Sequence, residues 1–378
     1  MEAKYKKIKQ SIKSKILEGL IQKHEKISSE SELMRQFDVS RHTVRLALGE
    51  LVNEGWLYRE QGAGTFCADR SAQEKDRSFV QQNKNIAIVT TYISEYIFPS
   101  IIRGAEGYLS EQGYHVSIFN TNNRYEQEKK ILSQLLSGNY DGIIIEPTHS
   151  ASANPNLKYY LNLERARIPY VMINALYEEL EPVYFMVDDE KGGYIQTKHL
   201  LELGHKEVAC MYKTDDSQGQ KRLKGYIKAH RDLNVSLNPK NIVTYSTENQ
   251  HTEPLAELKK LLAMKENKPT AIVCYNDQLV LYLMDEVRKL GIRIPEQLSL
   301  IGFDDSMLAE ISEVKLTSVK HPKSQLGLDA AKAIIQMIKK NEAIHTYDQL
   351  AQLYEPDLIV RQSTAEPNME HRDKLEKN

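Results

Sequence analysis

Two arginines near the start of the chain have the type and spacing expected of a helix that reads DNA. Arg41 and Arg45 are four residues apart, which places both side chains on one face of a predicted helix that begins at Ser40. The guanidinium fork of arginine matches the O6 and N7 atoms of guanine in the major groove. His42 and Thr43 lie in the first turn of the same helix, where a recognition helix meets bases and phosphates. We therefore expect five residues of this helix to contact double-stranded DNA, namely Ser40, Arg41, His42, Thr43 and Arg45.

The elements around these residues predict a winged helix-turn-helix. Helices are expected over residues 4–18, 29–37 and 40–48, and strands over residues 56–59 and 65–67. Ser29 is a suitable N-cap for the second helix, and Glu32 three residues later completes a capping box. Val44 and Leu48 supply an apolar stripe that holds the third helix against the others. Helices followed by a small hairpin are typical of a DNA-reading unit with a wing.

Further DNA contacts are expected from the ends of this unit. Lys4, with its lysine neighbours, would bind the phosphate backbone. Gln61, Gly62 and Gly64 lie in the turn of the hairpin, where glycine lets the wing backbone approach the duplex closely. Glu30, at the start of the second helix, completes the expected interface.

Structural alternatives to these assignments stay open. A lysine-rich first helix is often only a solvated face. Arg45 could form a surface ion pair with Glu30 or Glu50, and the glycines could simply close the hairpin. The ordered set of residues, more than any one of them, favours DNA binding.

The overall composition limits the class of protein. With 378 residues, the chain is too long for one ordinary core and suggests two or three domains. The net charge of -2 says little about nucleic acid, because the charge is unevenly spread and the first predicted helix is crowded with lysines, at positions 4, 6, 7, 9, 13 and 15. Three distant cysteines indicate neither a disulfide framework nor a zinc site. The N-terminus is charged, and no apolar run approaches the roughly 20 residues needed to cross a bilayer, so we expect a cytoplasmic protein without a metal or cofactor.

The rest of the chain has the rhythm of an α/β fold. Residues 69–84 are charged and aperiodic, which predicts a linker. One set of strands is expected over residues 86–89, 114–119, 142–145 and 170–173, and a second over 207–211, 242–245, 271–274 and 298–301. Amphipathic helices between them indicate parallel sheets with crossover connections. Two such sets predict two lobes and a cleft, with ligands beyond the carboxyl ends of the strands.

Polar and aromatic side chains gather where these strands end. The candidates are Tyr92, Glu95, Tyr96, Phe98, Asn174, Asn276 and Asp304, together with Arg222 on a helix that starts near residue 218. Carboxylate, amide and guanidinium groups suit the vicinal hydroxyls of a sugar, and an aromatic ring can cover its apolar face. Asp and Asn after a strand also often cap the next helix, and that alternative stays open here.

These patterns give a domain organisation. We expect a DNA-binding domain over residues 1–68, a linker over 69–84, an effector-binding and dimerisation domain over 85–363, and a charged, disordered tail over 364–378. The sequence has no nucleophile elbow, no phosphate loop of the Gly-Lys-Ser type and no zinc-ligand spacing, so an enzyme is not expected.

The first domain resembles the winged-helix domain of the GntR family. Three family patterns occur in order, at residues 27–33, 40–47 and 62–66. The chain departs from them at Ser28 and Ser31, where the family usually has proline and arginine. The resemblance implies a DNA-binding regulator.

The second domain resembles the effector domain of LacI/GalR regulators, which has the fold of periplasmic sugar-binding proteins. The matching stretches are residues 187–193, 203–205, 222–226, 275–277 and 301–306, in the order found in that family. The resemblance implies that Asn174, Arg222, Asn276 and Asp304 hold the ligand.

The combination of a GntR-type reader with a LacI-type receptor is similar to the arabinose-responsive repressors of Gram-positive bacteria. That resemblance implies repression of sugar-catabolism genes and release from DNA by L-arabinose. We expect a homodimer, because two recognition helices then fit successive major grooves of a pseudo-palindromic operator. Spacing and composition do not select arabinose, so another sugar, a phosphosugar or a nucleoside stays an alternative effector.

Overall fold

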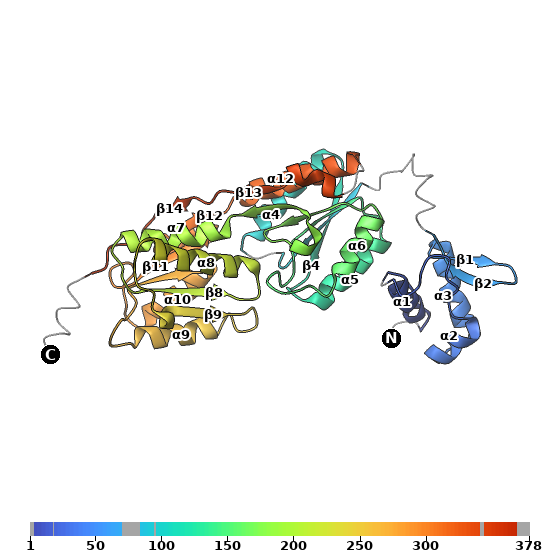
Figure 1. Cartoon of the computed structure of the whole chain (residues 1–378), viewed down its shortest axis with the longest axis horizontal. Coiled ribbons are helices and arrows are strands. Elements are labelled where there is room, and N and C mark those ends of the chain that lie inside the picture. The colour runs from blue at the N-terminus through green and yellow to red at the C-terminus, as the bar shows by residue number, and fades with distance from the viewer. Residues whose placement is uncertain (1–3, 18, 70–83, 94–95, 341–343, 369–378) are drawn as a thin grey trace.

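The computed structural model describes residues 4–17, 19–69, 84–93, 96–340 and 344–368, and its first unit is a winged helix-turn-helix (Figure 1). The elements are α1 (Lys4–Leu17), α2 (Glu30–Phe37), α3 (Arg41–Asn53), β1 (Leu57–Glu60) and β2 (Gly64–Cys67). The two strands are antiparallel and form the wing. The predicted order of elements is therefore confirmed.

The ends of α2 and α3 are set by short polar side chains. The Ser29 hydroxyl accepts a hydrogen bond from the backbone N–H of Glu32, whose carboxylate accepts one from the N–H of Ser29, as in a capping box. Asp38 ends α2 in the left-handed region, with φ of 49°, and so reverses the chain. Ser40 then caps α3. The turn between the two helices is thereby fixed locally.

The first α/β lobe has one fully parallel sheet. Its strands, in spatial order, are β4 (His115–Asn120), β3 (Asn85–Thr90), β5 (Gly142–Ile145), β6 (Tyr170–Ile173), β7 (Val183–Val187) and β13 (Gln352–Tyr354). Helices α4 (Phe98–Glu111) and α12 (Lys323–Lys340) share one apolar core with the sheet, while α5 (Tyr125–Ser137) and α6 (Leu157–Arg165) share another. The short helices η2 (Glu178–Leu180) and η4 (Ile344–Leu350) complete the lobe.

The second lobe repeats this plan with one difference. Its sheet order is β9 (Ile242–Tyr245), β8 (Val208–Lys213), β10 (Ala271–Cys274), β11 (Ser299–Asp304), β12 (Thr317–Lys320) and β14 (Leu358–Ile359). The helices are α7 (Asp189–Glu202), α8 (Ser217–Asp232), η3 (Pro239–Asn241), α9 (Glu253–Leu262), α10 (Asp277–Lys289) and α11 (Met307–Ile311). Contrary to the expected all-parallel pattern, β14 is antiparallel to β12. It is reached directly from β13, without a crossover helix.

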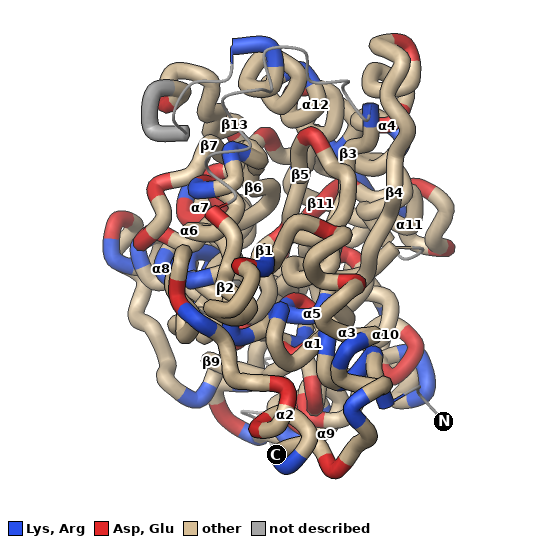
Figure 2. Tube along the Cα trace, turned by 90° about the vertical axis from the view of Figure 1, so that its right-hand side faces the viewer, with Lys and Arg blue, Asp and Glu red and all other residues tan. Residues whose placement is uncertain are grey.

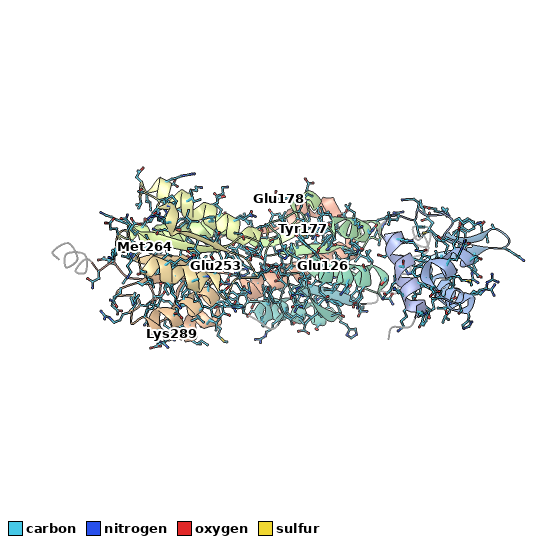
Figure 3. All side chains as sticks on the ribbon, turned by 90° about the horizontal axis from the view of Figure 1, so that it is seen from below. Glu126, Tyr177, Glu178, Glu253, Met264 and Lys289 are labelled. Atoms are coloured by element: carbon cyan, nitrogen blue, oxygen red, sulfur yellow. The ribbon has the colours of Figure 1, made fainter. Side chains whose placement is uncertain are left out.

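The chain crosses between the lobes three times, between β7 and α7, between β12 and α12, and between β13 and β14. Figure 3 marks the first lobe by Glu126, Tyr177 and Glu178, and the second by Glu253, Met264 and Lys289. Because each lobe is built from separate stretches of chain, the crossings can act as hinges between two rigid bodies.

The C-terminal end of the described chain lies against the second lobe. The backbone carbonyl of Ala365 is 2.9 Å from His205 Nε2 and accepts a hydrogen bond from the Ser299 hydroxyl. Residues 364–368, which we expected in the disordered tail, therefore belong to the ordered domain. The remainder of that tail, and most of the expected linker, lie outside the described residues. No helix in the described part of the chain is long and apolar enough to cross a membrane.

Glycines allow pairs of helices to pack with their backbones in contact. A Cβ atom at Gly104 of α4 would lie 2.1 Å from the carbonyl oxygen of Ser324, and one at Gly327 of α12 would lie 2.1 Å from that of Ile101. The α7 and α8 helices meet in the same way at Gly193 and Gly225. Any larger side chain at these positions must push the helices apart.

We predict that Gly327→Ala lowers the stability of the chain by about 1–3 kcal/mol, because the added methyl group collides with backbone. The control is Gly107→Ala on α4, where a Cβ atom meets nothing within 4 Å, and where alanine favours the helix by up to about 1 kcal/mol. Urea unfolding followed by circular dichroism measures both. Equal midpoints for the two variants would refute the close packing of α4 and α12.

Candidate functional site

A polar cavity of about 360 Å³ lies between the two lobes, where the carboxyl ends of their strands meet. Residues of both lobes line it. Of the residues predicted to bind an effector, the lining includes Tyr92, Tyr96, Phe98, Asn174, Arg222, Asn276 and Asp304. Glu95 lies outside the described residues. Residues far apart in the sequence were predicted from their places after parallel strands, and the structure brings them together around one cavity.

Arg222 is the most strongly held side chain of the second-lobe wall. Its Nε donates to Asp189 Oδ1 at 2.8 Å, and its Nη1 donates to the backbone carbonyl of Tyr275 at 2.6 Å. The guanidinium carbon lies 3.5 Å from the centre of the Phe303 ring. The Nη2 atom is 3.9 Å from Asp304 Oδ1. Burial works against the charge, but the carboxylates of Asp189 and Asp304 outweigh it and raise the pKa of Arg222.

Three glycines make room for this arrangement. A Cβ atom at Gly192 would lie 2.4 Å from the Phe303 ring, so only glycine lets that ring reach the guanidinium. A Cβ atom at Gly193 would lie 2.2 Å from the carbonyl oxygen of Arg222, and one at Gly225 would lie 2.0 Å from that of Glu190. The close crossing of α7 and α8 therefore brings Asp189 within hydrogen-bond reach of Arg222.

The first-lobe wall contains a buried carboxylate that the sequence reasoning missed. Glu146 follows β5, is 5% exposed, and accepts hydrogen bonds from the backbone and hydroxyl of Thr91 and from Asn174 Nδ2 at 2.9 Å. Burial raises the pKa of Glu146, although these hydrogen bonds lower it in part. Its place after a strand is the same signal that identified Asn174, so the rule could have found it.

A second missed group lies at the end of β8. Lys213 is 9% exposed, and its Nζ lies 3.4 Å from Asp216 Oδ2, which also accepts a hydrogen bond from the Tyr275 hydroxyl. Burial lowers the pKa of Lys213, but Asp216 and Asp215 outweigh it, so the net shift is upward. Lys213 was overlooked because the predicted strand stopped at residue 211.

One residue predicted to bind the effector, Asn276, caps the helix that follows its strand. Asn276 Oδ1 accepts a hydrogen bond from the backbone N–H of Leu279 at 2.9 Å, so Asn276 caps α10 while it also lines the cavity. Asp304 is different, because the cap of the following helix α11 is Ser306. Asp304 is free of that role and faces Arg222.

Several hydrogen bonds join the two lobes across the cavity. The Tyr96 hydroxyl donates to the carbonyl of Phe303 at 2.9 Å and accepts from the N–H of Asp277 at 3.1 Å. Asn123 Nδ2 donates to the Thr247 hydroxyl at 3.1 Å. The Ser150 hydroxyl accepts from the backbone N–H of Ser217, at the start of α8, at 2.9 Å. These contacts define a closed arrangement of the lobes.

Backbone strain is concentrated around the same cavity. Tyr96, Asn174 and Asp304 have positive φ angles of 60°, 64° and 91°. Asparagine tolerates this region, whereas tyrosine and aspartate adopt it at a cost of about 1–3 kcal/mol. Such strain is kept where it places a side chain that function needs. Among the described residues, no cluster of His, Cys, Asp and Glu could hold a metal ion.

The predicted DNA-reading residues lie on an exposed face of the first unit. Arg41 and Arg45 have side chains 60% and 62% exposed. Arg45 Nε donates to both carboxylate oxygens of Glu30, at 3.1 and 3.0 Å, and Arg41 Nε lies 3.8 Å from the same carboxylate. Arg45 therefore forms the surface ion pair with Glu30 that was one of the alternatives to a DNA contact. Exposed ion pairs contribute at most about 1 kcal/mol, so DNA can displace this one.

Some of the other residues predicted to contact DNA are exposed, and others already make polar contacts within the chain. His42, Gln61, Gly62 and Gly64 are exposed. The hydroxyls of Ser40 and Thr43 are 2.9 Å apart and share the cap of α3. Lys4 Nζ lies 3.5 Å from the carbonyl of Asp38, at the turn between α2 and α3. Charges of both signs are interleaved around these helices (Figure 2).

Two lysines of α1 form ion pairs within the first unit, although lysines of this helix were expected to bind the phosphate backbone of DNA. Lys9 Nζ is 2.6 Å from Glu50 and also pairs with Glu54, and Lys13 Nζ is 3.9 Å from Glu54. These lysines therefore pack α1 against α3, whereas Lys4, Lys6 and Lys7 are exposed. In this arrangement Glu50 pairs with Lys9, and Arg45 pairs with Glu30.

Two stretches of the chain match known protein families. Residues 4–67 match the family described as bacterial regulatory proteins, gntR family, and residues 197–364 match the periplasmic binding protein-like domain. The arabinose metabolism transcriptional repressor of Halalkalibacterium halodurans is 58% identical over 98% of this chain and 99% of its own length. The repressor of the same name from Geobacillus stearothermophilus is 46% identical over 96% of this chain and 98% of its own length.

A solved structure shares the fold. The transcriptional regulator CelR in complex with cellobiose superposes with a TM-score of 0.66, at 21% identity, over 89% of this chain and all of that one. At this level of identity the likeness concerns the fold alone.

We predict that Tyr96→Phe opens the cleft, because it removes two hydrogen bonds between the lobes. Each contributes about 1 kcal/mol, so loss of both, about 2 kcal/mol, shifts an open–closed equilibrium about thirtyfold. Spin labels on cysteines introduced at Glu126 and Glu253, in different lobes (Figure 3), report the distance by electron resonance, and the three native cysteines are buried.

The matched control is Tyr108→Phe, since Tyr108 is on α4 of the same lobe and packs against the apolar core of that lobe. It should leave the distance distribution unchanged. A distribution for Tyr96→Phe identical to that of the parent chain would contradict the role of Tyr96 in closure.

Proposed function

This chain belongs to the family of the arabinose metabolism transcriptional repressors, and we propose that it is itself a DNA-binding repressor of sugar-utilisation genes that L-arabinose releases from its operator. The observation that carries the proposal is the joining of two sites in one chain. An exposed, arginine-bearing recognition helix precedes a receptor whose polar cavity has one wall on each lobe. The relatives are regulators, so the chain is a regulator and not an enzyme.

The charges around the cavity favour an uncharged ligand over a phosphosugar. Among the described lining residues, the acidic side chains are Glu146, Asp189, Asp216 and Asp304, and the basic ones are Lys213 and Arg222. Both basic groups already pair with carboxylates. A phosphate group would find no unpaired cation there and would face excess negative charge. Hydroxyls, by contrast, can donate to the carboxylates and accept from amides.

The closed arrangement offers a route from sugar to DNA. A sugar that touches both walls adds contacts only when the lobes are closed, so it shifts the population toward closure. Closure tilts one lobe against the other about the three crossings. In a homodimer, which we propose as the working form, such a tilt changes the spacing of the two recognition helices and hence their fit to successive major grooves. The protein acts in the cytoplasm, where its DNA is.

The direct test is operator affinity with and without sugar. We expect saturating L-arabinose to weaken binding of the full chain to promoter DNA of its own sugar-utilisation genes by at least about tenfold, which is within the usual range of allosteric coupling. Fluorescence anisotropy at fixed salt measures it. A panel with other pentoses, a pentose phosphate and a nucleoside separates the alternative effectors, and unchanged affinity with L-arabinose would refute the proposed inducer.

Variants on α8 localise that response. Arg222→Ala should still bind operator DNA but should no longer respond to L-arabinose, because the second-lobe wall loses its anchor. Asp304→Ala should behave in the same way. Arg231→Ala removes an exposed arginine from the same helix and should respond normally. Normal induction in Arg222→Ala would remove that residue from the sugar site.

We predict that Arg45→Ala weakens specific operator binding by about 1–3 kcal/mol, the usual value of one good base contact. Its affinity for L-arabinose by calorimetry should be unchanged, since the cavity is in another domain. Arg231→Ala again serves as the charge-matched control for DNA binding. Wild-type affinity for the operator in Arg45→Ala would exclude a base contact by this side chain.

A further inference from the structure

His321 has a buried ring nitrogen that the described chain leaves without a partner. The side chain is 5% exposed and lines the cavity between the lobes. Its Nε2 lies 3.2 Å from Asn174 Oδ1, whereas Nδ1 has no hydrogen-bond partner among the described residues. Five other buried side-chain atoms in that part of the chain also lack a hydrogen-bond partner, but none belongs to a residue that lines the cavity. Buried polar atoms without partners are uncommon and ask for an explanation.

A chain of hydrogen bonds determines which ring nitrogen carries the proton. Glu146 Oε2 accepts from the backbone N–H and hydroxyl of Thr91, and Glu146 Oε1 accepts from Asn174 Nδ2 at 2.9 Å. This orients the Asn174 amide, so that its oxygen faces His321. The oxygen can only accept, and the proton is therefore on His321 Nε2. Nδ1 is left with a lone pair.

The ring is neutral at ordinary pH. Burial, with smaller effects from the charges of Lys323 and Arg222, lowers the pKa of His321 to about 3. A neutral imidazole with its proton on Nε2 presents Nδ1 as a hydrogen-bond acceptor. A donor therefore satisfies Nδ1, and another acceptor does not.

We propose that His321 Nδ1 accepts a hydrogen bond from one hydroxyl of the bound sugar, and that this acceptor is a determinant of sugar specificity. The inference rests on the function proposed above and names a residue that the sequence did not indicate. A ligand with a hydroxyl at this place satisfies the buried nitrogen. A deoxy sugar, or a ligand with a carbonyl or ether oxygen there, leaves the nitrogen buried and unpaired, which the site penalises.

The position of His321 gives the contact a second consequence. The residue directly follows β12, in the second crossing between the lobes, while its partners Asn174 and Glu146 belong to the first lobe. A sugar hydroxyl bonded to Nδ1 therefore touches one of the hinges as well as the wall of the cavity. Sugar binding at this atom restrains the crossing itself.

The test is calorimetry of the full chain with L-arabinose, using two substitutions that separate the two ring nitrogens. His321→Gln can place an amide N–H near the position of Nε2 and keep the bond to Asn174, but it offers no acceptor near Nδ1. We expect its affinity to fall about 10- to 100-fold. His321→Asn can place an amide oxygen near Nδ1, and it should lose less affinity than His321→Gln.

Deoxy sugars identify the hydroxyl without relying on a folded variant. The 2-, 3- and 4-deoxy derivatives of L-arabinose are titrated against the wild-type chain and against His321→Gln. One of them should lose at least about tenfold in affinity for the wild-type chain and almost nothing for His321→Gln, because the partner is already absent. Equal losses for all derivatives in both proteins would overturn the assignment.

The failures are distinguishable. If the wild-type chain does not bind L-arabinose, the proposed function fails and the role of His321 falls with it. If the wild-type chain binds and His321→Gln binds equally well, only the role of His321 is wrong. A crystal structure of the wild-type chain with L-arabinose decides the matter even if both variants misfold. A sugar oxygen within hydrogen-bond distance of Nδ1 supports the proposal, and a sugar with no oxygen there overturns it.

Discussion

The buried guanidinium of Arg222 is the interaction on which the receptor depends. An arginine in this position is stable only because Asp189 and Asp304 neutralise it and the Phe303 ring covers one of its faces. Those partners come from α7 and β11, and Arg222 itself is on α8, so one side chain ties together the elements that form the second-lobe wall. The cluster also explains why α7 and α8 carry glycine at their crossing: a bulkier residue would separate the pair.

The first-lobe wall is organised around the carboxylate of Glu146, a hydrogen-bond acceptor, and not around a cation. Glu146 holds Asn174, and Asn174 holds His321, so three polar residues from separate stretches have fixed orientations before any ligand arrives. Preorganisation of this kind reduces the cost of ordering side chains on binding. Because the two walls belong to lobes joined by three crossings, a ligand held by both converts its binding free energy into a preference for the closed arrangement.

The sequence predicted the fold class and much of the cavity, and the omissions have physical causes. Asn174 and Asp304 were found because polar groups after buried strands converge at one sheet edge. Arg222 was found from its place on the predicted helix near residue 218 and from the resemblance to LacI/GalR regulators. Lys213 was missed because a lysine within a strand interrupts the apolar run that defines it. His321 follows β12, whose sequence Thr-Ser-Val-Lys has too few apolar residues to be recognised as a strand. The pairing of Arg45 with Glu30 was one of several open choices, since sequence alone does not orient long side chains.

The central claim is that the cavity and the recognition helix are energetically coupled, and reciprocity gives the most direct measurement. Any factor by which a sugar weakens operator binding must equal the factor by which the operator weakens sugar binding. Calorimetric titration of the full chain with L-arabinose, in the absence and in the presence of saturating operator DNA, measures this second factor. We expect sugar affinity to be lower on the DNA-bound protein, by the same ratio found for operator release. Identical affinities in the two titrations would contradict the coupling.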